Sequence, residues 1–185
     1  MKRIDPKRLV FVDECGTNIG LVPLYARAPK GERAFAKAPR NRGKNTTLLA
    51  PLSLEGIGPC VAVEGSTTRA VFEAYVEQVL APTLKKGHFV VLDNLSAHKG
   101  DKVRELVEAR GASVLFLPPY SPDLSPIEEA FSKVKALLRR ARARSREALV
   151  GAIGEALDTV GQQDVLGWFA HCGYLRKPHL PRETL

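Results

Sequence analysis

Two short apolar runs in this chain each end in an aspartate. Asp13 closes the run LVFVD (residues 9–13), and Asp93 closes the run FVVLD (residues 89–93). Both runs have the length and the β-branched content of a buried strand. A carboxylate at the end of such a strand is costly to desolvate unless a cation neutralises it. If the two strands are neighbours, they bring both acids to the sheet edge where open α/β folds bind ligands.

A third acid, Glu128, follows Asp93 after 34 intervening residues and lies at the start of a predicted helix over residues 126–142. Two strand-end acids and one acid on a nearby helix are what a divalent-metal phosphoryl-transfer site requires. Each acid also has a simpler explanation. Asp13 and Asp93 could be turn or cap residues, and Glu128 could close a capping box with Ser125.

Two of these acids have an acidic neighbour, and geometry allows only one of each pair to face a common site. Glu14 follows Asp13, but successive strand residues point to opposite faces of a sheet. Glu129 follows Glu128, but the next residue of a helix is rotated by about 100°. Asp13, Asp93 and Glu128 are therefore the predicted catalytic residues and metal ligands.

The remaining patterns predict an α/β fold with a mixed five-stranded sheet flanked by helices. Strands are expected at residues 9–13, 47–54, 59–65, 89–93 and 113–118. Helices are expected from Ser66 or Thr67 to about residue 80, and at 99–110, 126–142, 146–160 and 164–170. One catalytic domain spans 1–175, a basic arm or loop is inserted at 15–46, and 176–185 form a C-terminal tail.

Basic residues outnumber acidic ones by 28 to 20, and a net charge of +8 favours nucleic acid as partner. Seven basic residues lie between Arg27 and Lys44, and seven more, without an acid, between Lys133 and Arg146. The alternative to phosphate contact is a solvated surface, but unrelieved like charges repel one another. The predicted DNA-binding residues are Lys30, Arg33, Lys37, Arg40, Arg42, Lys44, Lys135, Arg139, Arg142 and Arg146, with the last four on one helical face.

Two residues after the second strand are auxiliary candidates. Asn94 follows Asp93 directly, and His98 lies five residues beyond Asp93. His98 could contact a phosphate or orient a water, or it could be a polar residue at a helix start. The three cysteines are widely spaced and predict neither a disulfide framework nor a zinc site. The first residues do not resemble a signal peptide, so we expect a cytoplasmic protein that does not enter a membrane.

Three stretches, FVDE, VLDNLSAH and LPPYSPDLSPIEEAFSKVK, resemble the signature blocks of DDE transposases. The resemblance is to the mariner-like superfamily, in its bacterial insertion-sequence branch, and covers roughly residues 9–140. It implies a ribonuclease H-like fold and a nucleoid-associated enzyme of a mobile element. It also implies that Asp13, Asp93 and Glu128 hold two Mg²⁺ ions, for which Mn²⁺ can substitute. The implied reaction cleaves phosphodiesters at transposon ends and joins the 3′-hydroxyl ends to target DNA.

The resemblance also implies partners. Such enzymes assemble on DNA as homodimers, and their clamp-like loops suggest that the arm contacts a second subunit. The family aromatic after the Glu pair is commonly Trp and is Phe131 here. Helix-turn-helix domains usually precede the first catalytic strand, and this sequence starts about eight residues before it. We therefore expect a split or truncated product and a separate helix-turn-helix subunit. The alternatives are a non-catalytic or domesticated DNA-binding remnant and a ribonuclease H-like nuclease that does not join strands.

Overall fold

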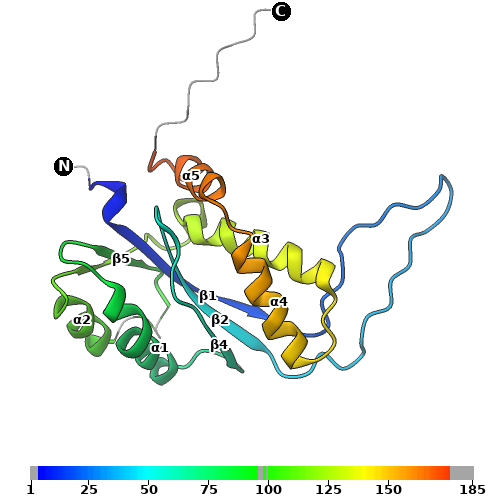
Figure 1. The fold of residues 1–185 in the computed structure, drawn as a ribbon, viewed down its shortest axis with the longest axis horizontal. Helices are drawn as coiled ribbons and strands as arrows, with labels where there is room; N and C mark the ends of the chain where they lie inside the picture. The colour runs from blue at the N-terminus through cyan, green and yellow to red at the C-terminus, as the bar shows by residue number, and fades with distance from the viewer. Residues whose placement is uncertain (1–3, 96–97, 99, 176–185) are drawn as a thin grey trace, which may run out of the picture.

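A central sheet lies between two layers of helices in the computed structural model, which describes residues 4–95, 98 and 100–175 (Figure 1). The sheet order is β3-β2-β1-β5-β6, with β4 also paired to β2. β1 pairs with β2 in antiparallel fashion and with β5 in parallel, and β5 pairs with β6 in parallel. The predicted mixed α/β sheet flanked by helices is therefore confirmed. The strands are β1 (Leu9–Thr17), β2 (Thr46–Ser53), β3 (Gly56–Ile57), β4 (Val61–Glu64), β5 (Phe89–Leu92) and β6 (Ser113–Phe116).

The sheet has six strands, so the predicted number of five is wrong. The extra strand, β3, lies between the strands expected at residues 47–54 and 59–65. It pairs with Leu52 and Ser53 of β2, whereas β4 pairs with residues 46–49 of the same strand edge. Pro51 lies between these two stretches, and its carbonyl accepts a hydrogen bond from Gly58 N–H (2.9 Å). Because proline has no N–H to donate, the edge ladder is interrupted there and divides into two short strands.

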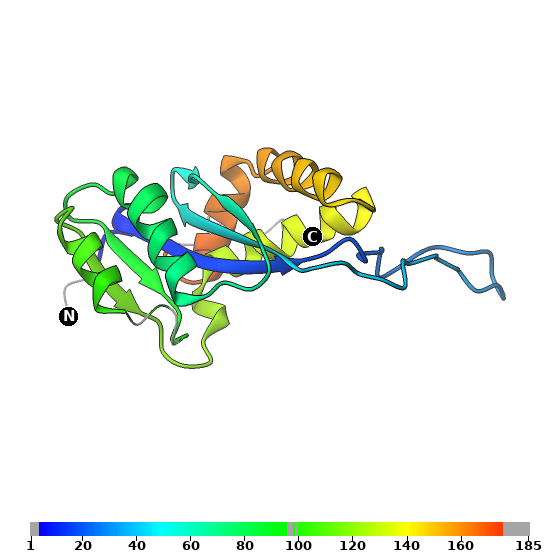
Figure 2. The same cartoon turned by 90° about the horizontal axis from the view of Figure 1, so that it is seen from below.

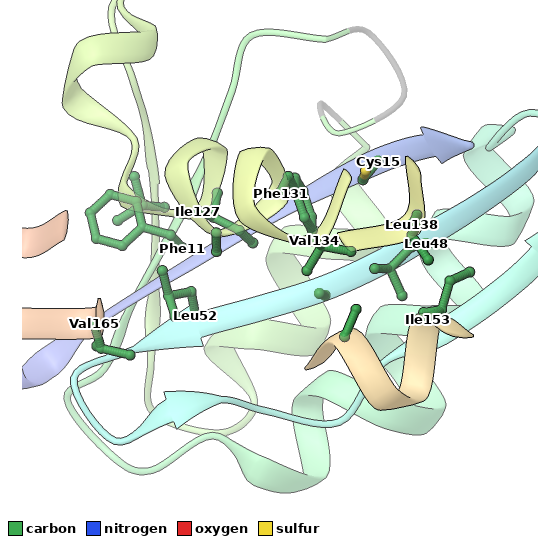
Figure 3. Close-up of a cluster of buried hydrophobic side chains, with 14 of the residues drawn as sticks. Phe11, Cys15, Leu48, Leu52, Ile127, Phe131, Val134, Leu138, Ile153 and Val165 are labelled. Atoms are coloured by element: carbon green, nitrogen blue, oxygen red, sulfur yellow. The ribbon is translucent and has the colours of Figure 1, made fainter. Parts of the chain in front are cut away.

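Alternating apolar residues of the strands separate the core into two clusters, one on each face of the sheet. Odd-numbered residues of β1, such as Leu9 and Phe11, pack with α3, α4 and α5. Even-numbered residues, such as Val10 and Val12, pack with α1 and α2. Figure 3 shows the first cluster between the strands and the C-terminal helices. Continued along β1, this alternation directs Asp13 toward α3 and its neighbour Glu14 toward the α1 layer.

The helices begin within three residues of the predicted positions. α1 is capped by the Thr68 side chain, which accepts a hydrogen bond from Val71 N–H (3.3 Å), rather than by Ser66 or Thr67. A π-helical turn, η2 (Val76–Leu80), and a short 3-10 turn, η3 (Ala81–Thr83), continue it. Among the described residues, the α-helices are α1 (Arg69–Tyr75), α2 (Asp101–Glu108), α3 (Pro126–Ala141), α4 (Arg146–Asp158) and α5 (Gln162–His171). Two further 3-10 turns are η1 (Pro6–Arg8) and η5 (Pro122–Leu124).

A long arm leaves the body between β1 and β2 and projects beyond the end of α3 (Figures 1 and 2). β1 continues to Thr17, where it still pairs with Thr46. The arm without helix or strand is therefore residues 18–45, shorter than the predicted 15–46. At its base, the Arg144 guanidinium donates to the carbonyls of Ile19 (2.8 Å) and Leu21 (3.0 Å). The predicted tail, 176–185, lies outside the described residues.

Within the described part of the chain, none of the helices has the length and apolar character needed to cross a membrane.

Candidate active site

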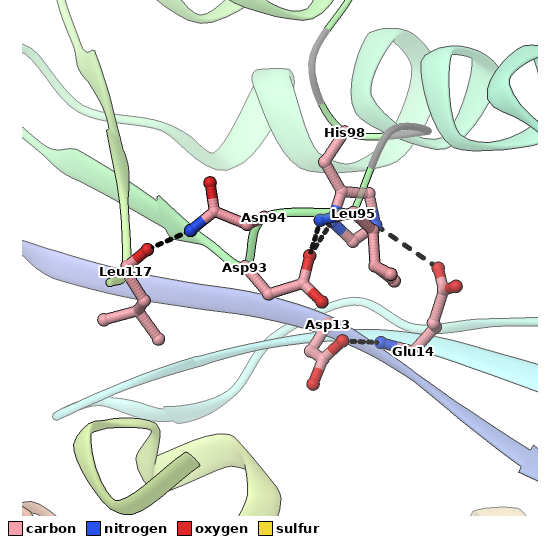
Figure 4. A network of polar contacts seen from close by, with 7 residues as sticks. All are labelled: Asp13, Glu14, Asp93, Asn94, Leu95, His98 and Leu117. Carbon is pink, nitrogen blue, oxygen red and sulfur yellow. Dashed lines mark hydrogen bonds and ion pairs between the residues drawn. The ribbon is translucent and has the colours of Figure 1, made fainter. Parts of the chain in front are cut away.

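Asp13 and Asp93 occupy equivalent positions on two neighbouring strands. The parallel pairing of β1 with β5 runs from Leu9 opposite Phe89 to Phe11 opposite Val91. Each aspartate lies two residues beyond the last of these pairs. Asp13 is still within β1, whereas Asp93 follows the last residue of β5. The predicted convergence of the two strand ends is thus present in the fold (Figure 4).

Glu128 reaches the same place from the first turn of α3, and all three acids line one pocket of about 450 Å³. The pocket opens at the sheet edge formed by the ends of β5 and β6. Its remaining wall comes from the segment after β5 and from the proline-rich segment before α3. The lining residues are Asp13, Asp93, Asn94, Leu95, Leu117, Pro118, Pro119, Tyr120, Ser121, Pro122, Ser125 and Glu128.

The capping-box explanation for Glu128 is wrong. Ser125 is the N-cap of α3, but its side chain makes no capping hydrogen bond. The backbone N–H of Ser125, which a capping glutamate would accept from, instead donates to the carbonyl of Pro122 in η5 (2.9 Å). Glu129 lies on another side of the helix, where its carboxylate is 3.0 Å from Nδ1 of His171 in α5. Of the two glutamates, only Glu128 lines the pocket.

The environment of Asp13 disfavours its charged carboxylate. Burial, together with the negative charges of Glu128 and Asp93, raises the pKa of Asp13 to about 7. The hydrogen bond from Glu14 N–H (2.7 Å) and the charge of His98 oppose this rise without cancelling it. A nearby cation would relieve both the desolvation and the repulsion.

The chemistry of this donor set fits a divalent cation. Three carboxylates are the ligand type that Mg²⁺ and Mn²⁺ prefer, and the raised pKa of Asp13 shows that the pocket disfavours a negative charge on this carboxyl in the absence of a cation. Across residues 4–95, 98 and 100–175, no three His, Cys, Asp or Glu side chains lie close enough together to hold one ion. The acids therefore line the pocket without forming a closed cluster.

His98 is buried beneath the surface, so a direct phosphate contact, one of the alternatives considered for this residue, does not fit its position. Its side chain is fully buried, with Nδ1 2.5 Å from Oδ1 of Asp93 and Nε2 3.3 Å from Oε2 of Glu14 (Figure 4). Its ring packs against Phe72 with a centroid distance of 4.1 Å. Burial lowers the pKa of His98, but the hydrogen bonds to Asp93 and Glu14 outweigh burial and raise the pKa to about 9.

Asn94, the other auxiliary candidate, lines the pocket and also has a structural contact. Its side-chain amide donates to the carbonyl of Leu117 and so connects the end of β5 to the end of β6. Tyr120 was not predicted as a site residue, yet it lines the pocket with its side chain fully exposed and its backbone at φ 57°. The sequence signals for this wall were the prolines around Tyr120 and the signature-like block LPPYSPDLSPIEEAFSKVK that contains it.

The predicted DNA-binding residues lie on two regions near the arm. Those of the arm, from Lys30 to Lys44, are exposed. The expectation that Lys135, Arg139, Arg142 and Arg146 share one helical face is wrong, because α3 ends at Ala141. Arg142 takes a left-handed conformation (φ 50°, ψ 40°) that turns the chain, and Arg146 begins α4.

Two of the predicted DNA contacts also have partners within the protein. Lys44 lies 2.7 Å and Arg146 3.4 Å from the carboxylate of Glu64, so this acid connects the base of the arm to the start of α4. Both pairs are largely exposed, and such pairs contribute little to stability. Lys135 instead lies next to the buried Cys15 thiol. Burial raises the pKa of this thiol, and the positive charge of Lys135 opposes the rise.

The geometry of the pocket agrees with the sequence family that the chain matches. The sequence profile of the DDE superfamily endonucleases matches residues 8–150. The chain belongs to this superfamily. No curated protein matches the chain.

Solved structures of the Mos1 mariner transposase share the fold. A pre-cleavage Mos1 transpososome gives a TM-score of 0.68 at 19% identity, covering 92% of this chain and 54% of that one. A Mos1 strand transfer complex gives 0.66 at 21% identity, covering 90% and 52%. The Mos1 catalytic domain alone gives 0.63 at 19% identity, covering 91% and 78%. The predicted ribonuclease H-like fold is thereby confirmed, and the chain spans about half the length of the longer Mos1 chains.

Proposed function

We propose that this chain is the catalytic part of a DNA transposase of the mariner-like superfamily, in its bacterial insertion-sequence branch. It would cleave phosphodiesters at transposon ends and join the freed 3′-hydroxyl ends to target DNA. The observation that carries the proposal is the meeting of Asp13, Asp93 and Glu128 in one pocket of a chain that belongs to the DDE endonuclease superfamily.

Asp13, Asp93 and Glu128 would hold two Mg²⁺ ions, or Mn²⁺ in their place. Mos1 structures with Mg and with Mn are among those that share the fold. When bound, such an ion pair activates an attacking hydroxyl and stabilises the leaving oxygen of an in-line displacement. Asp13 would hold the ions from β1, Asp93 from the end of β5 and Glu128 from the first turn of α3.

The protein would hold DNA through its basic surfaces. The exposed cations of the arm, together with Lys135, Arg139, Arg142 and Arg146, can contact successive phosphates, and the pocket takes the scissile one. A Mos1 paired-end complex with the left transposon end and a Mos1 strand transfer complex are among the structures of the same fold. We expect a homodimer on DNA, a separate helix-turn-helix subunit that reads the transposon ends, and action at the bacterial nucleoid in the cytoplasm.

A plasmid-nicking assay tests the catalytic step. We expect the chain to nick supercoiled DNA with Mg²⁺ or Mn²⁺ and not with a chelator present. Asp13→Asn, Asp93→Asn and Glu128→Gln should each reduce nicking to background. Glu129→Gln is the matched control, because Glu129 pairs with His171 outside the pocket, and it should retain activity. Nicking that survives Glu128→Gln and is lost in Glu129→Gln would reverse the assignment.

A second assay tests strand joining. An oligonucleotide with a 3′-hydroxyl end is mixed with target plasmid and the divalent ion, and a 3′-deoxy oligonucleotide serves as control. The proposed function predicts covalent joining of the first and none of the second. Nicking without joining would support a ribonuclease H-like nuclease instead. The absence of both nicking and joining would support a DNA-binding remnant.

A further inference from the structure

The two aspartates of the pocket are held by the backbone to different extents. Asp13 lies within β1 and is paired on one side with Ala50 of β2. Asp93 lies beyond the end of β5, two residues past the last β1–β5 pair, Phe11 opposite Val91. The strand ladder thus places Asp13 firmly, but side-chain contacts must contribute to the placement of the Asp93 carboxylate relative to β1.

A buried histidine makes such a contact. Nδ1 of His98 is 2.5 Å from Oδ1 of Asp93, and the same oxygen accepts the N–H of Leu95 (3.0 Å). On the opposite side of the ring, Nε2 is 3.3 Å from the carboxylate of Glu14. Glu14 is the β1 residue next to Asp13, so His98 connects the loop after β5 with β1 beyond the end of their ladder.

The ring of His98 is itself held in place. It stacks on Phe72 of α1 at 4.1 Å between centroids, and Phe72 is completely buried in the core cluster on that face of the sheet. The alternation of β1 explains why Glu14 is available there: Asp13 faces α3 and the pocket, and Glu14 faces the α1 layer. Two adjacent acids therefore serve two faces, one lining the pocket and one holding His98.

We propose that His98 is a positioning residue that, held by Glu14, fixes the orientation in which the Asp93 carboxylate enters the pocket. The inference rests on the proposed function, in which Asp93 binds a divalent ion. Hydrogen-bond partners of metal-binding side chains orient those ligands, and their loss typically weakens metal binding by about 10- to 100-fold. His98 needs no contact with DNA or metal for this role.

Two amide substitutions separate the two contacts of the ring. The amide nitrogen of Asn lies near the position of histidine Nδ1, and that of Gln lies near Nε2. His98→Asn can therefore still donate to Asp93, whereas His98→Gln can reach only toward Glu14. With MnCl₂ alone as the probe, calorimetry on the full chain should show about 10- to 100-fold weaker binding for His98→Gln. The Mn²⁺ affinity of His98→Asn should lie nearer to that of the wild type. His171→Gln, which changes an exposed histidine, is the control and should bind Mn²⁺ as tightly as the wild type.

Stability is measured in parallel by thermal unfolding without metal. If His98 only fills space, His98→Asn and His98→Gln should both be less stable than the wild type. Their Mn²⁺ affinities should then not depend on whether the amide nitrogen replaces Nδ1 or Nε2. Glu14→Gln is the variant that keeps the buried ring intact, and it should weaken Mn²⁺ binding in the same direction by a smaller factor. If His98→Gln binds Mn²⁺ as tightly as the wild type, the inference is overturned while the proposed function stands. If His98→Gln does not fold, the same result in Glu14→Gln overturns it. No Mn²⁺ binding by the wild type contradicts the proposed function and the inference together.

Discussion

Replacing Asp13 by Asn should stabilise the metal-free protein while it abolishes catalysis. Asn has nearly the same shape and keeps an oxygen that can accept the Glu14 N–H, but it carries no charge to desolvate. Burial, with the charges of Glu128 and Asp93, raises the pKa of Asp13 from 3.8 to about 7. Each tenfold change in proton affinity is worth about 1.4 kcal/mol, so the ionised carboxylate costs the folded state about 4 kcal/mol.

The sign of the effect follows from proton linkage. Because the folded pKa lies above the unfolded one, the folded state binds the proton more tightly between pH 3.8 and about pH 7. The contribution of Asp13 to stability is therefore complete below pH 3.8, falls as the pH rises, and is lost above about pH 7. Asp13→Asn should match wild type near pH 4 and exceed it by up to about 4 kcal/mol near pH 8.

Urea unfolding at both pH values, with a chelator present, measures this difference. Adding Mn²⁺ at pH 8 supplies an internal control, since a ligand at 100 times its dissociation constant stabilises the folded state by about 2.7 kcal/mol. Mn²⁺ should stabilise the wild type and leave Asp13→Asn nearly unchanged. An Asp13→Asn protein that is no more stable than wild type at pH 8 would refute the reasoning, because it would mean that the Asp13 carboxylate is adequately solvated or paired.

Three further predictions concern the basic surface and the core. DNA affinity, measured by fluorescence anisotropy on an arbitrary duplex, should fall about a thousandfold between about 50 and 200 mM salt if six or more phosphates are contacted; a nearly constant affinity would contradict this. Arg142→Gly should raise the free energy of unfolding by about 1 kcal/mol, because the left-handed backbone at φ 50° favours glycine. Arg142→Ala should not raise it. Both variants should weaken DNA binding to the same extent, because both remove the same positive charge. Phe11→Ala should lower the free energy of unfolding, measured in urea, by about 3–5 kcal/mol, because this ring is 1% exposed and packs edge-on against Phe169 and Tyr174. A loss below about 1 kcal/mol would be inconsistent with that packing.

The strands and the three acids could be predicted because their signals are local. Buried strands in an α/β sheet are short apolar runs, and an aspartate at the end of one is visible without knowledge of the fold. The alternation along β1 also predicted that Asp13 and Glu14 face opposite sides. The rotation of one helical residue indicated that Glu128 and Glu129 would not both serve one site, and the resemblance to the DDE signature blocks favoured Glu128.

The features that sequence reasoning missed depend on tertiary contacts. Nothing local shows that His98 is buried, because its partner Glu14 lies 84 residues away in the chain. The sequence predicted separate helices at 126–142 and 146–160, but no glycine or asparagine indicates the left-handed turn at Arg142. Basic residues of two helices were therefore assigned to one helical face. The two-residue strand β3 is below the length at which a pattern can be recognised, and its separation from β4 follows from Pro51 on the neighbouring strand.

The most direct test of the central claim is anomalous diffraction from crystals of the chain soaked in MnCl₂. The account predicts Mn²⁺ in the pocket, bound directly by a carboxylate oxygen of Asp13, with Asp93 and Glu128 completing the protein ligands. A second ion, if the pair is complete, should lie about 3.5–4 Å from the first. Mn²⁺ bound at other acids, such as Glu129 beside His171, with none between Asp13 and Asp93, would contradict the claim that these three carboxylates form the catalytic site.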